Sequence, residues 1–225
     1  MSCRLHSALL VGPLANLVLR NSDGLVIAVD AGLARCLRLK IRPDFAVGDW
    51  DSLKSETGTV KSARALLRKY PHVTLNQDKE RSDLFYALRT AFSLGVRQIL
   101  CTGFTGGRPD HHFATLLDLA EAASGKLGRV DSVEAQDEAA SYYFLSRRTF
   151  PLKFATEKGQ LISLFGLDPF TSGVFSSGLK YPWNGASPRG GSHGLSNIAT
   201  GKHCRIEVAR GKLLVIVPHR IPKDT

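Results

Sequence analysis

The stretch that organises this chain is residues 45–53, which read Phe-Ala-Val-Gly-Asp-Trp-Asp-Ser-Leu. A short apolar run ends in a glycine, and two carboxylates, Asp49 and Asp51, follow directly. A strand that ends in such a turn holds both acids at the C-terminal edge of a sheet, where open α/β sheets bind ligands. Carboxylate oxygens are also the ligands that Mg²⁺ shares with water and phosphate. A polar surface turn is the alternative, because Asp and Gly are ordinary turn residues.

The composition is that of a globular protein, with 225 residues of which 43% are hydrophobic and 22% are charged. No apolar run is long enough to span a bilayer, so we expect no membrane partner. The apolar run at 8–11 is interrupted by Gly12-Pro13, and we interpret it as a first strand rather than a signal sequence. Scattered cysteines without a C-x-x-C pair disfavour a zinc site or a disulfide framework and favour a cytoplasmic protein. They are Cys3, Cys36, Cys101 and Cys204.

The formal net charge is +10, from 30 Lys and Arg against 20 Asp and Glu. Such a charge attracts polyanions, and both nucleotides and nucleic acids belong to that class. The basic residues are spread along the chain, and the densest pairs, such as Arg147-Arg148, are short. The charge alone therefore favours neither kind of partner.

Up to about residue 128, short apolar runs alternate with segments of helical periodicity. This alternation predicts an α/β domain with a mostly parallel, Rossmann-like sheet. We expect strands at 8–11, 26–29, 45–47, 73–75 and 98–102, and helices at 33–39, 60–70, 83–92 and 113–123.

From about residue 129 the helical periodicity stops, and turns rich in Gly, Pro and Ser separate short β-rich runs. This pattern of short β-rich runs separated by turns predicts a small all-β sandwich or barrel. The boundary falls near 146–151, which gives an α/β catalytic domain at 1–146 and a β domain at 147–225. We expect a mobile loop at 182–194 and strands at 141–145, 160–165, 171–176, 203–208 and 213–217.

Two further turns carry candidate site residues. Ser82 is a good N-cap, so Asp83 falls in the first turn of a helix, where it could simply stabilise the helix dipole. The glycine-rich turn that contains Gly106 and Gly107 lies between a strand and a helix, where backbone N–H groups can approach phosphates closely. Arg108 could bind a phosphate with two N–H groups. The alternative is a connector in which Arg108 pairs with Asp110.

Taken in order, these motifs resemble those of thiamine pyrophosphokinases, and the resemblance covers most of the chain. Glu80 stands where that family usually has Asp, and Ser82 where it has Thr. The segments that carry the resemblance are Asp30-Ala31-Gly32, Pro43-Asp44, Gly48-Asp49-Trp50-Asp51-Ser52, Lys79-Glu80-Arg81-Ser82-Asp83, Gly106-Gly107-Arg108-Pro109-Asp110-His111, Ser177-Gly178-Leu179-Lys180-Tyr181 and Ser196-Asn197.

The resemblance implies an enzyme that transfers a diphosphoryl group from ATP to the hydroxyl of thiamine and releases AMP. It implies a homodimer, with Mg²⁺ held by the catalytic acids Asp49, Asp51 and Asp83. The residues that it implies at the nucleotide are Asp30, Lys79, Gly106, Gly107, Arg108 and Asp110. Those that it implies at thiamine are Gln77, in the turn before Asp83, and Tyr181, Trp183, Ser196 and Asn197, in the second domain.

Two other functions remain open at this point. A diphosphokinase of the same architecture could act on another hydroxymethyl heterocycle, such as a pterin. A nucleic-acid-binding protein would need basic residues interleaved with aromatic ones on one face. We find no such run in the sequence, so we expect thiamine and ATP, and no nucleic acid, as partners.

Overall fold

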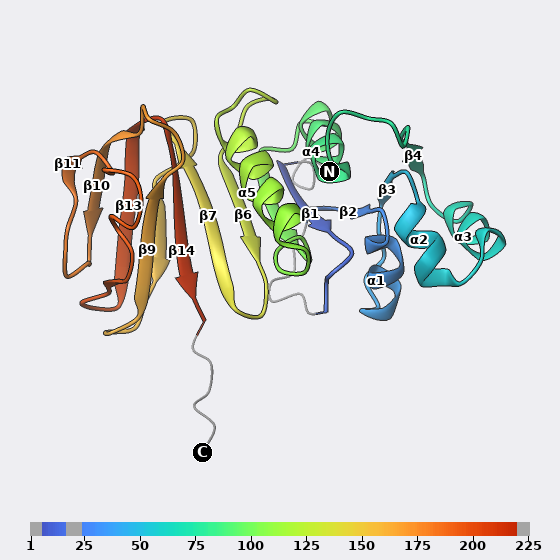
Figure 1. Ribbon diagram of the computed structural model, residues 1–225, viewed down its shortest axis with the longest axis horizontal. Coiled ribbons are helices and arrows are strands. Elements are labelled where there is room, and N and C mark those ends of the chain that lie inside the picture. Colours follow the sequence, from blue (N-terminus) through green and yellow to red (C-terminus); the bar gives the residue numbers. More distant parts are fainter. Residues whose placement is uncertain (1–5, 17–23, 220–225) are drawn as a thin grey trace, which may run out of the picture. The chain divides into compact units, whose positions relative to one another are not determined.

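The computed structural model describes residues 6–16 and 24–219, and the chain divides into two compact units. Unit 1 is Met1–Asp118 with Ala135–Asp137, and unit 2 is Leu119–Glu134 with Glu138–Thr225. This division places 119–134 with the second unit, whereas the change in composition predicts a boundary after residue 146. Figure 1 labels most of the helices and strands of the two units.

Unit 1 is built on parallel strands in the order β5-β1-β2-β3-β4. Strands that are buried on both faces appear in sequence as nearly continuous apolar runs, which explains why they could be located. Their parallel pairing confirms the expected mostly parallel sheet in this part of the chain. The bounds are β1 (Ser7–Val11), β2 (Leu25–Val29), β3 (Phe45–Gly48), β4 (His72–Thr74) and β5 (Gln98–Thr102).

The helices lie between these strands, and two of them differ from expectation. Residues 51–57 form a helix where we expected only a turn, and the last helix begins at Pro109 rather than near residue 113. Proline fits the first helical position, because that residue's N–H has no partner within the helix. No helix in the described part of the chain is long and apolar enough to cross a membrane. The bounds are α1 (Gly32–Arg38), α2 (Asp51–Thr57), α3 (Val60–Leu67), α4 (Asp83–Ser93) and α5 (Pro109–Ala123).

Helix α4 has the apolar face that its sequence predicts. Leu84, Leu88, Ala91 and Phe92 recur at helical spacing and are all buried. The helix packs over β2 and β3, so its N-terminus lies near the carboxyl ends of these strands. This placement brings the first residues of α4 toward the acidic turns that follow β2 and β3.

Unit 2 contains two antiparallel groups of strands, in the orders β12-β9-β14-β7 and β11-β10-β13-β8. Buried and exposed residues alternate along His203–Arg210, as expected for a strand with one face on the core. Strands β6 and β8 and the short β11 and β12 were not expected. The bounds are β6 (Ser132–Gln136), β7 (Ala140–Ser146), β8 (Leu152–Ala155), β9 (Leu161–Gly166), β10 (Ser172–Ser177), β11 (Asn184–Ala186), β12 (Asn197–Ile198), β13 (His203–Arg210) and β14 (Lys212–Pro218).

The core of unit 2 draws side chains from both antiparallel groups. Leu164 of β9 and Val215 of β14 join Val174 of β10 and Ile206 of β13 in one buried cluster. Two sheets that share a core in this way form a layered β structure. The expectation of an all-β second half therefore agrees with the strands of this unit.

Candidate active site

The first two acids of the site follow neighbouring strands. Strand β2 leads into Asp30 and strand β3 leads into Asp49, and the two strands pair in parallel. A Cβ atom on Gly48 would lie only 2.9 Å from the Cα of Asp30, so only glycine allows the two turns to approach this closely. The N–H of Asp30 donates to the carbonyl of Val47 at 2.9 Å. The ends of β2 and β3 therefore bring two carboxylates together at one edge of the sheet.

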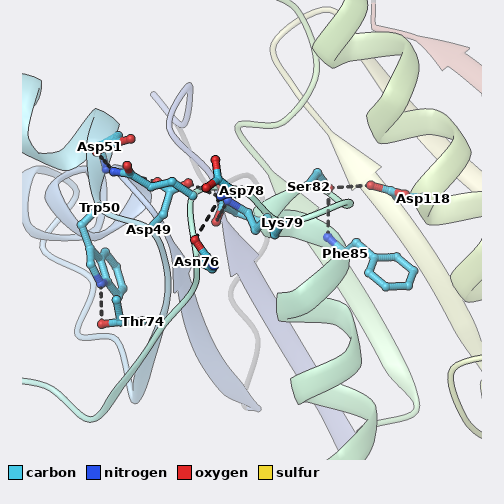
Figure 2. Close-up of polar contacts among 12 residues, drawn as sticks. Asp49, Trp50, Asp51, Thr74, Asn76, Asp78, Lys79, Ser82, Phe85 and Asp118 are labelled. Atoms are coloured by element: carbon cyan, nitrogen blue, oxygen red, sulfur yellow. Dashed lines mark hydrogen bonds and ion pairs between the residues drawn. The ribbon is translucent and has the colours of Figure 1, made fainter.

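Lys79 links this edge to the start of α4. Its Nζ lies 2.5 Å from Asp49 Oδ2 and 3.3 Å from Asp83 Oδ1, and its side chain is only 10% exposed. Figure 2 shows the Lys79 side chain extending toward Asp49. The structure thus brings together Asp49 and Asp83, which the sequence analysis assigned to metal binding, and Lys79, which it assigned to nucleotide binding.

The pKa values in this cluster reflect burial and mutual charge. Burial raises the pKa of Asp30 and of Asp83, and the negative charge of Asp49 raises both further. Desolvation acts to raise the pKa of Asp49 too, but the hydrogen bond and charge of Lys79 help outweigh it, so that pKa is lowered. For Lys79, burial opposes the charged form, yet the two carboxylates keep its pKa raised. At neutral pH, Asp49 and Lys79 form an ion pair.

Asp51 turns away from this ion pair. It begins α2, and its Oδ1 accepts hydrogen bonds from Lys54 Nζ at 2.8 Å and from Gln77 Nε2 at 2.6 Å. Its own N–H donates to Asp49 Oδ1 at 3.2 Å. The structure therefore joins Asp51 to Asp49 through the backbone, while its carboxylate faces Lys54 and Gln77.

Trp50 is a residue of the site that sequence reasoning missed. It is buried at a φ of 69°, and its Nε1–H donates to Thr74 Oγ1 at 2.8 Å (Figure 2). A positive φ is uncommon outside glycine and is held here by the buried indole and its hydrogen bond. The sequence of acid, aromatic and acid at 49–51 was the available signal, because it places one buried aromatic side chain between two carboxylates.

The donor set suits a hard cation, although no metal geometry is formed in the described residues. No group of three His, Cys, Asp or Glu side chains in them is arranged as a metal site. Two buried oxygens, Asp30 Oδ1 and Asp83 Oδ1, accept no hydrogen bond, although the latter has the 3.3 Å ion pair with Lys79. Buried carboxylate oxygens without donors are unfavourable unless a cation compensates them. Carboxylates are the ligands that Mg²⁺ takes in proteins, so the residues fit this metal.

The glycine-rich turn before α5 has the geometry of the connector alternative. Gly106 and Gly107 have φ values of 83° and 63°. Arg108 donates to both carboxylate oxygens of Asp110, at 3.2 and 2.6 Å, and both side chains are exposed. The hydrogen bond from Arg108 is the main cause that lowers the pKa of Asp110 to about 2. In this structure Nε and Nη2 of the Arg108 guanidinium therefore both bind Asp110.

A separate pocket lies within unit 2. Its volume is about 740 Å³, and Tyr181, Trp183, His193, Leu195 and Asn197 are among its lining residues. Trp183 packs edge-on to His193 at 5.0 Å between ring centroids and is also part of the buried core cluster. Tyr181 is 60% exposed, with the ammonium of Lys180 5.4 Å from its ring centre. The pocket thus offers one fixed and one accessible aromatic ring.

Asn197 lines this pocket, and Ser196 precedes Asn197 in the sequence. The buried Asn197 amide donates to the carbonyl of Tyr181 at 2.7 Å and accepts from the N–H groups of Tyr181 and Ile198. Ser196 is exposed at a φ of 57°, and its N–H donates to Ser163 Oγ at 3.0 Å. In this structure Asn197 fixes the backbone at Tyr181, whereas the side chain of Ser196 faces solvent.

Comparisons with known proteins agree with this arrangement. A family model described as "Thiamin pyrophosphokinase, catalytic domain" matches residues 17–128. The chain is 25% identical over 195 residues to thiamine pyrophosphokinase of Bacillus subtilis (strain 168), an alignment that covers 84% of this chain and 85% of that protein.

Solved structures extend the likeness to nearly the whole fold. Thiamine pyrophosphokinase from Bacillus subtilis superposes with a TM-score of 0.77 at 22% identity, over 96% of this chain and 100% of that one. Thiamin pyrophosphokinase from Geobacillus thermodenitrificans gives 0.76 at 23% identity, over 96% and 99%. At these identities the structural likeness shows the fold alone.

Proposed function

Because the chain belongs to the thiamine pyrophosphokinase family, we propose that it transfers a diphosphoryl group from ATP to the hydroxyl of thiamine. The observation that carries this proposal is the bridge by Lys79 between Asp49 and Asp83, next to the buried Asp30. In the reaction, the thiamine oxygen bonds to the β-phosphorus, the bond from that phosphorus to the α–β bridging oxygen breaks, and AMP leaves. The hydroxyl proton passes to a nearby base.

We assign Asp49, Asp51 and Asp83 to Mg²⁺, as the catalytic and metal-binding acids. Mg²⁺, when bound, supplies positive charge to the phosphate oxygens. Two buried carboxylate oxygens that accept no hydrogen bond, Asp30 Oδ1 and Asp83 Oδ1, support a cation here, although the latter also pairs with Lys79 at 3.3 Å. Asp51 becomes available to Mg²⁺ when its hydrogen bonds from Lys54 and Gln77 break. The side chain of Gln77 is exposed and that of Lys54 is half-buried, so both can move.

The cations and glycines of unit 1 are proposed to hold the nucleotide. Lys79 already carries a positive charge at the acid cluster and can pair with a phosphate oxygen in exchange for one carboxylate. Gly106 and Gly107 have backbone conformations that allow close approach of an anion. Arg108 and Asp110 lie at the start of the next helix, α5. Together these residues suit a Rossmann-like nucleotide layer, which we include in the proposal.

The pocket of unit 2 is proposed to hold thiamine. A flat cation gains from an aromatic face by about 0.5–2 kcal/mol, depending on desolvation. Tyr181 and Trp183 offer such faces, and the exposed Ser196 lies in sequence between the lining residues Leu195 and Asn197. Asn197 acts by holding the backbone of Tyr181. Gln77, at the other unit, is assigned to the substrate through the amide that now binds Asp51.

An acceptor comparison tests the choice of substrate. The protein is given ATP and Mg²⁺ with thiamine or with a hydroxymethyl pterin, and kcat/KM is measured for each acceptor. We expect thiamine to be preferred by about 5- to 30-fold, which corresponds to about 1–2 kcal/mol, because a pterin lacks the cationic ring that the aromatic faces favour. Equal values, or a preference for the pterin, would transfer the assignment to the alternative acceptor.

A further inference from the structure

We infer that Asp118 of α5 is a positioning residue for the acid cluster, acting through the first turn of α4. Its side chain is 11% exposed, and its carboxylate accepts hydrogen bonds from Ser82 Oγ at 2.6 Å and from Arg81 Nη2 at 3.1 Å. Figure 2 shows Asp118 directed at Ser82, on the side of that residue opposite to Lys79. A buried acid in an otherwise apolar helical run is costly unless it is paired, which points to a specific role.

The hydroxyl group of Ser82 makes two hydrogen bonds, one as an acceptor and one as a donor to Asp118. Ser82 Oγ accepts from the N–H of Phe85 at 3.1 Å, which is the N-cap interaction of α4. Its single hydrogen is directed at Asp118 Oδ2. A hydroxyl has only one hydrogen to donate, so the bond to Asp118 leaves the lone pairs of Ser82 for the helix N–H. Asp118 therefore determines how the cap is oriented.

The contact with Arg81 anchors the preceding residue in the same way. The guanidinium of Arg81 lies 3.9 Å above the ring of Phe85 while its Nη2 binds Asp118. Residues 81 and 82 are thus tied to α5 and to the first turn of α4 at once. The positive charge of Arg81 also compensates the negative charge of this buried carboxylate.

The contacts of Arg81 and Ser82 with Asp118 also affect the positions of Lys79 and Asp83, which lie close to them in the sequence. Asp83 directly follows Ser82, and the ion pair between Lys79 and Asp83 spans residues 81 and 82. A shift of the cap moves both partners of that ion pair relative to Asp49. Outer groups that orient metal ligands typically change metal affinity or activity by 10–100-fold when they are removed.

Metal binding and stability are measured separately in the test. Mn²⁺ serves as a paramagnetic probe for the Mg²⁺ site, and its dissociation constant is measured by electron paramagnetic resonance on the full chain without nucleotide. We expect about 10-fold weaker Mn²⁺ binding for Asp118→Asn and for Ser82→Ala. Ser82→Thr keeps the hydroxyl and is expected to stay within about threefold of the wild type. Thermal unfolding and kcat at saturating metal are recorded for each variant.

Two control variants remove the same kinds of contact elsewhere. Asp168→Asn alters a carboxylate that accepts from the Phe170 N–H and the Thr171 hydroxyl, and Thr59→Ala removes the N-cap of α3. Both can lower the melting temperature, and neither should weaken Mn²⁺ binding.

The inference rests on the proposed role of Asp83, and the outcomes separate the two. Wild-type protein that turns over ATP and binds Mn²⁺, with unchanged binding in Asp118→Asn and Ser82→Ala, would overturn the positioning role alone. A wild type that neither binds Mn²⁺ nor turns over ATP would overturn both. If Asp118→Asn does not fold, Ser82→Ala decides by itself.

Discussion

The ammonium of Lys79 lies 2.5 Å from Oδ2 of Asp49, a residue that precedes it by 30 positions. This contact joins the turn after β3 to the turn before α4. Because Asp83 shares the same ammonium and Asp30 is buried nearby, the cluster holds more carboxylates than compensating cations. A further cation at this edge of the sheet relieves that imbalance, which is the physical basis of the proposed Mg²⁺ site.

Removal of single charges from the cluster should abolish most activity without unfolding the protein. Asp49→Asn, Asp51→Asn and Asp83→Asn are each expected to lower kcat and kcat/KM together by about 100-fold, because a contact made in the transition state is lost. Steady-state rates check this, and circular dichroism confirms that each variant is folded. Nearly normal turnover in all three variants would restore the surface-turn and helix-dipole interpretations.

The aromatic pocket should affect thiamine rather than ATP. Tyr181→Ala is expected to raise the KM for thiamine by roughly 5- to 30-fold, which corresponds to about 1–2 kcal/mol, and to leave the KM for ATP unchanged. Phe170→Ala is the matched control, since Phe170 is another exposed aromatic ring of the same unit with an arginine above it. Equal effects on both substrates would move the acceptor site out of this pocket.

Substitutions at Asn197 and at Ser196 should affect different properties, namely stability at Asn197 and thiamine binding at Ser196. Asn197→Ala removes the partner of the N–H and carbonyl groups of Tyr181 and should lower the free energy of unfolding by about 1–3 kcal/mol. Ser196→Ala removes an exposed hydroxyl and should raise only the KM for thiamine. Urea titration and steady-state kinetics measure the two effects. An Asn197→Ala variant of unchanged stability would contradict the structural role given to that amide.

Most strands of unit 1 could be predicted because they are short, nearly continuous apolar runs; β4, with the sequence His-Val-Thr and all three residues exposed, is the exception. The end of β5 at Thr102 and the N-cap at Ser82 agree with expectation, because turn glycines and capping residues act locally. Helix α2 was missed, since Asp51 to Thr57 shows no apolar periodicity and is determined by the turn at Trp50.

The site was predicted less completely than the fold. Motif order identified Asp49, Lys79 and Asp83, but it did not indicate that Lys79 would bridge the two acids. Asp118 lies in a part of α5 that reads as an apolar helix face, and its partners Arg81 and Ser82 are 37 and 36 residues away. Such long-range polar contacts leave no periodic signal, so only the structure reveals them.

The buried thiols provide an independent test of the packing. Cys36, Cys101 and Cys204 are buried and free, whereas Cys3 lies outside the described residues. Burial raises the pKa of Cys36 to about 12, so at pH 8 only roughly one thiol in 10,000 is the reactive thiolate. In a Cys3→Ser background, a disulfide reagent should modify almost no thiol until denaturant is added. Rapid modification of the native protein would contradict the described cores.

The homodimer implied by the resemblance is a further prediction. Exposed edge strands favour covering by another chain, and β11 and β12 lie at the ends of their strand groups. Light scattering at micromolar concentration should give twice the mass of the 24.5 kDa chain. A monomer at that concentration would contradict the predicted homodimer.

The identity of the nucleotide product tests the central claim most directly. The protein is incubated with ATP, Mg²⁺ and thiamine, and the phosphorus nuclei are followed by magnetic resonance. A diphosphoryl transfer at the Asp49, Lys79 and Asp83 cluster predicts AMP and thiamine diphosphate in equal amounts, and about 100-fold slower formation of both in the Asp49→Asn variant. ADP with thiamine monophosphate, or no consumption of ATP, would contradict it.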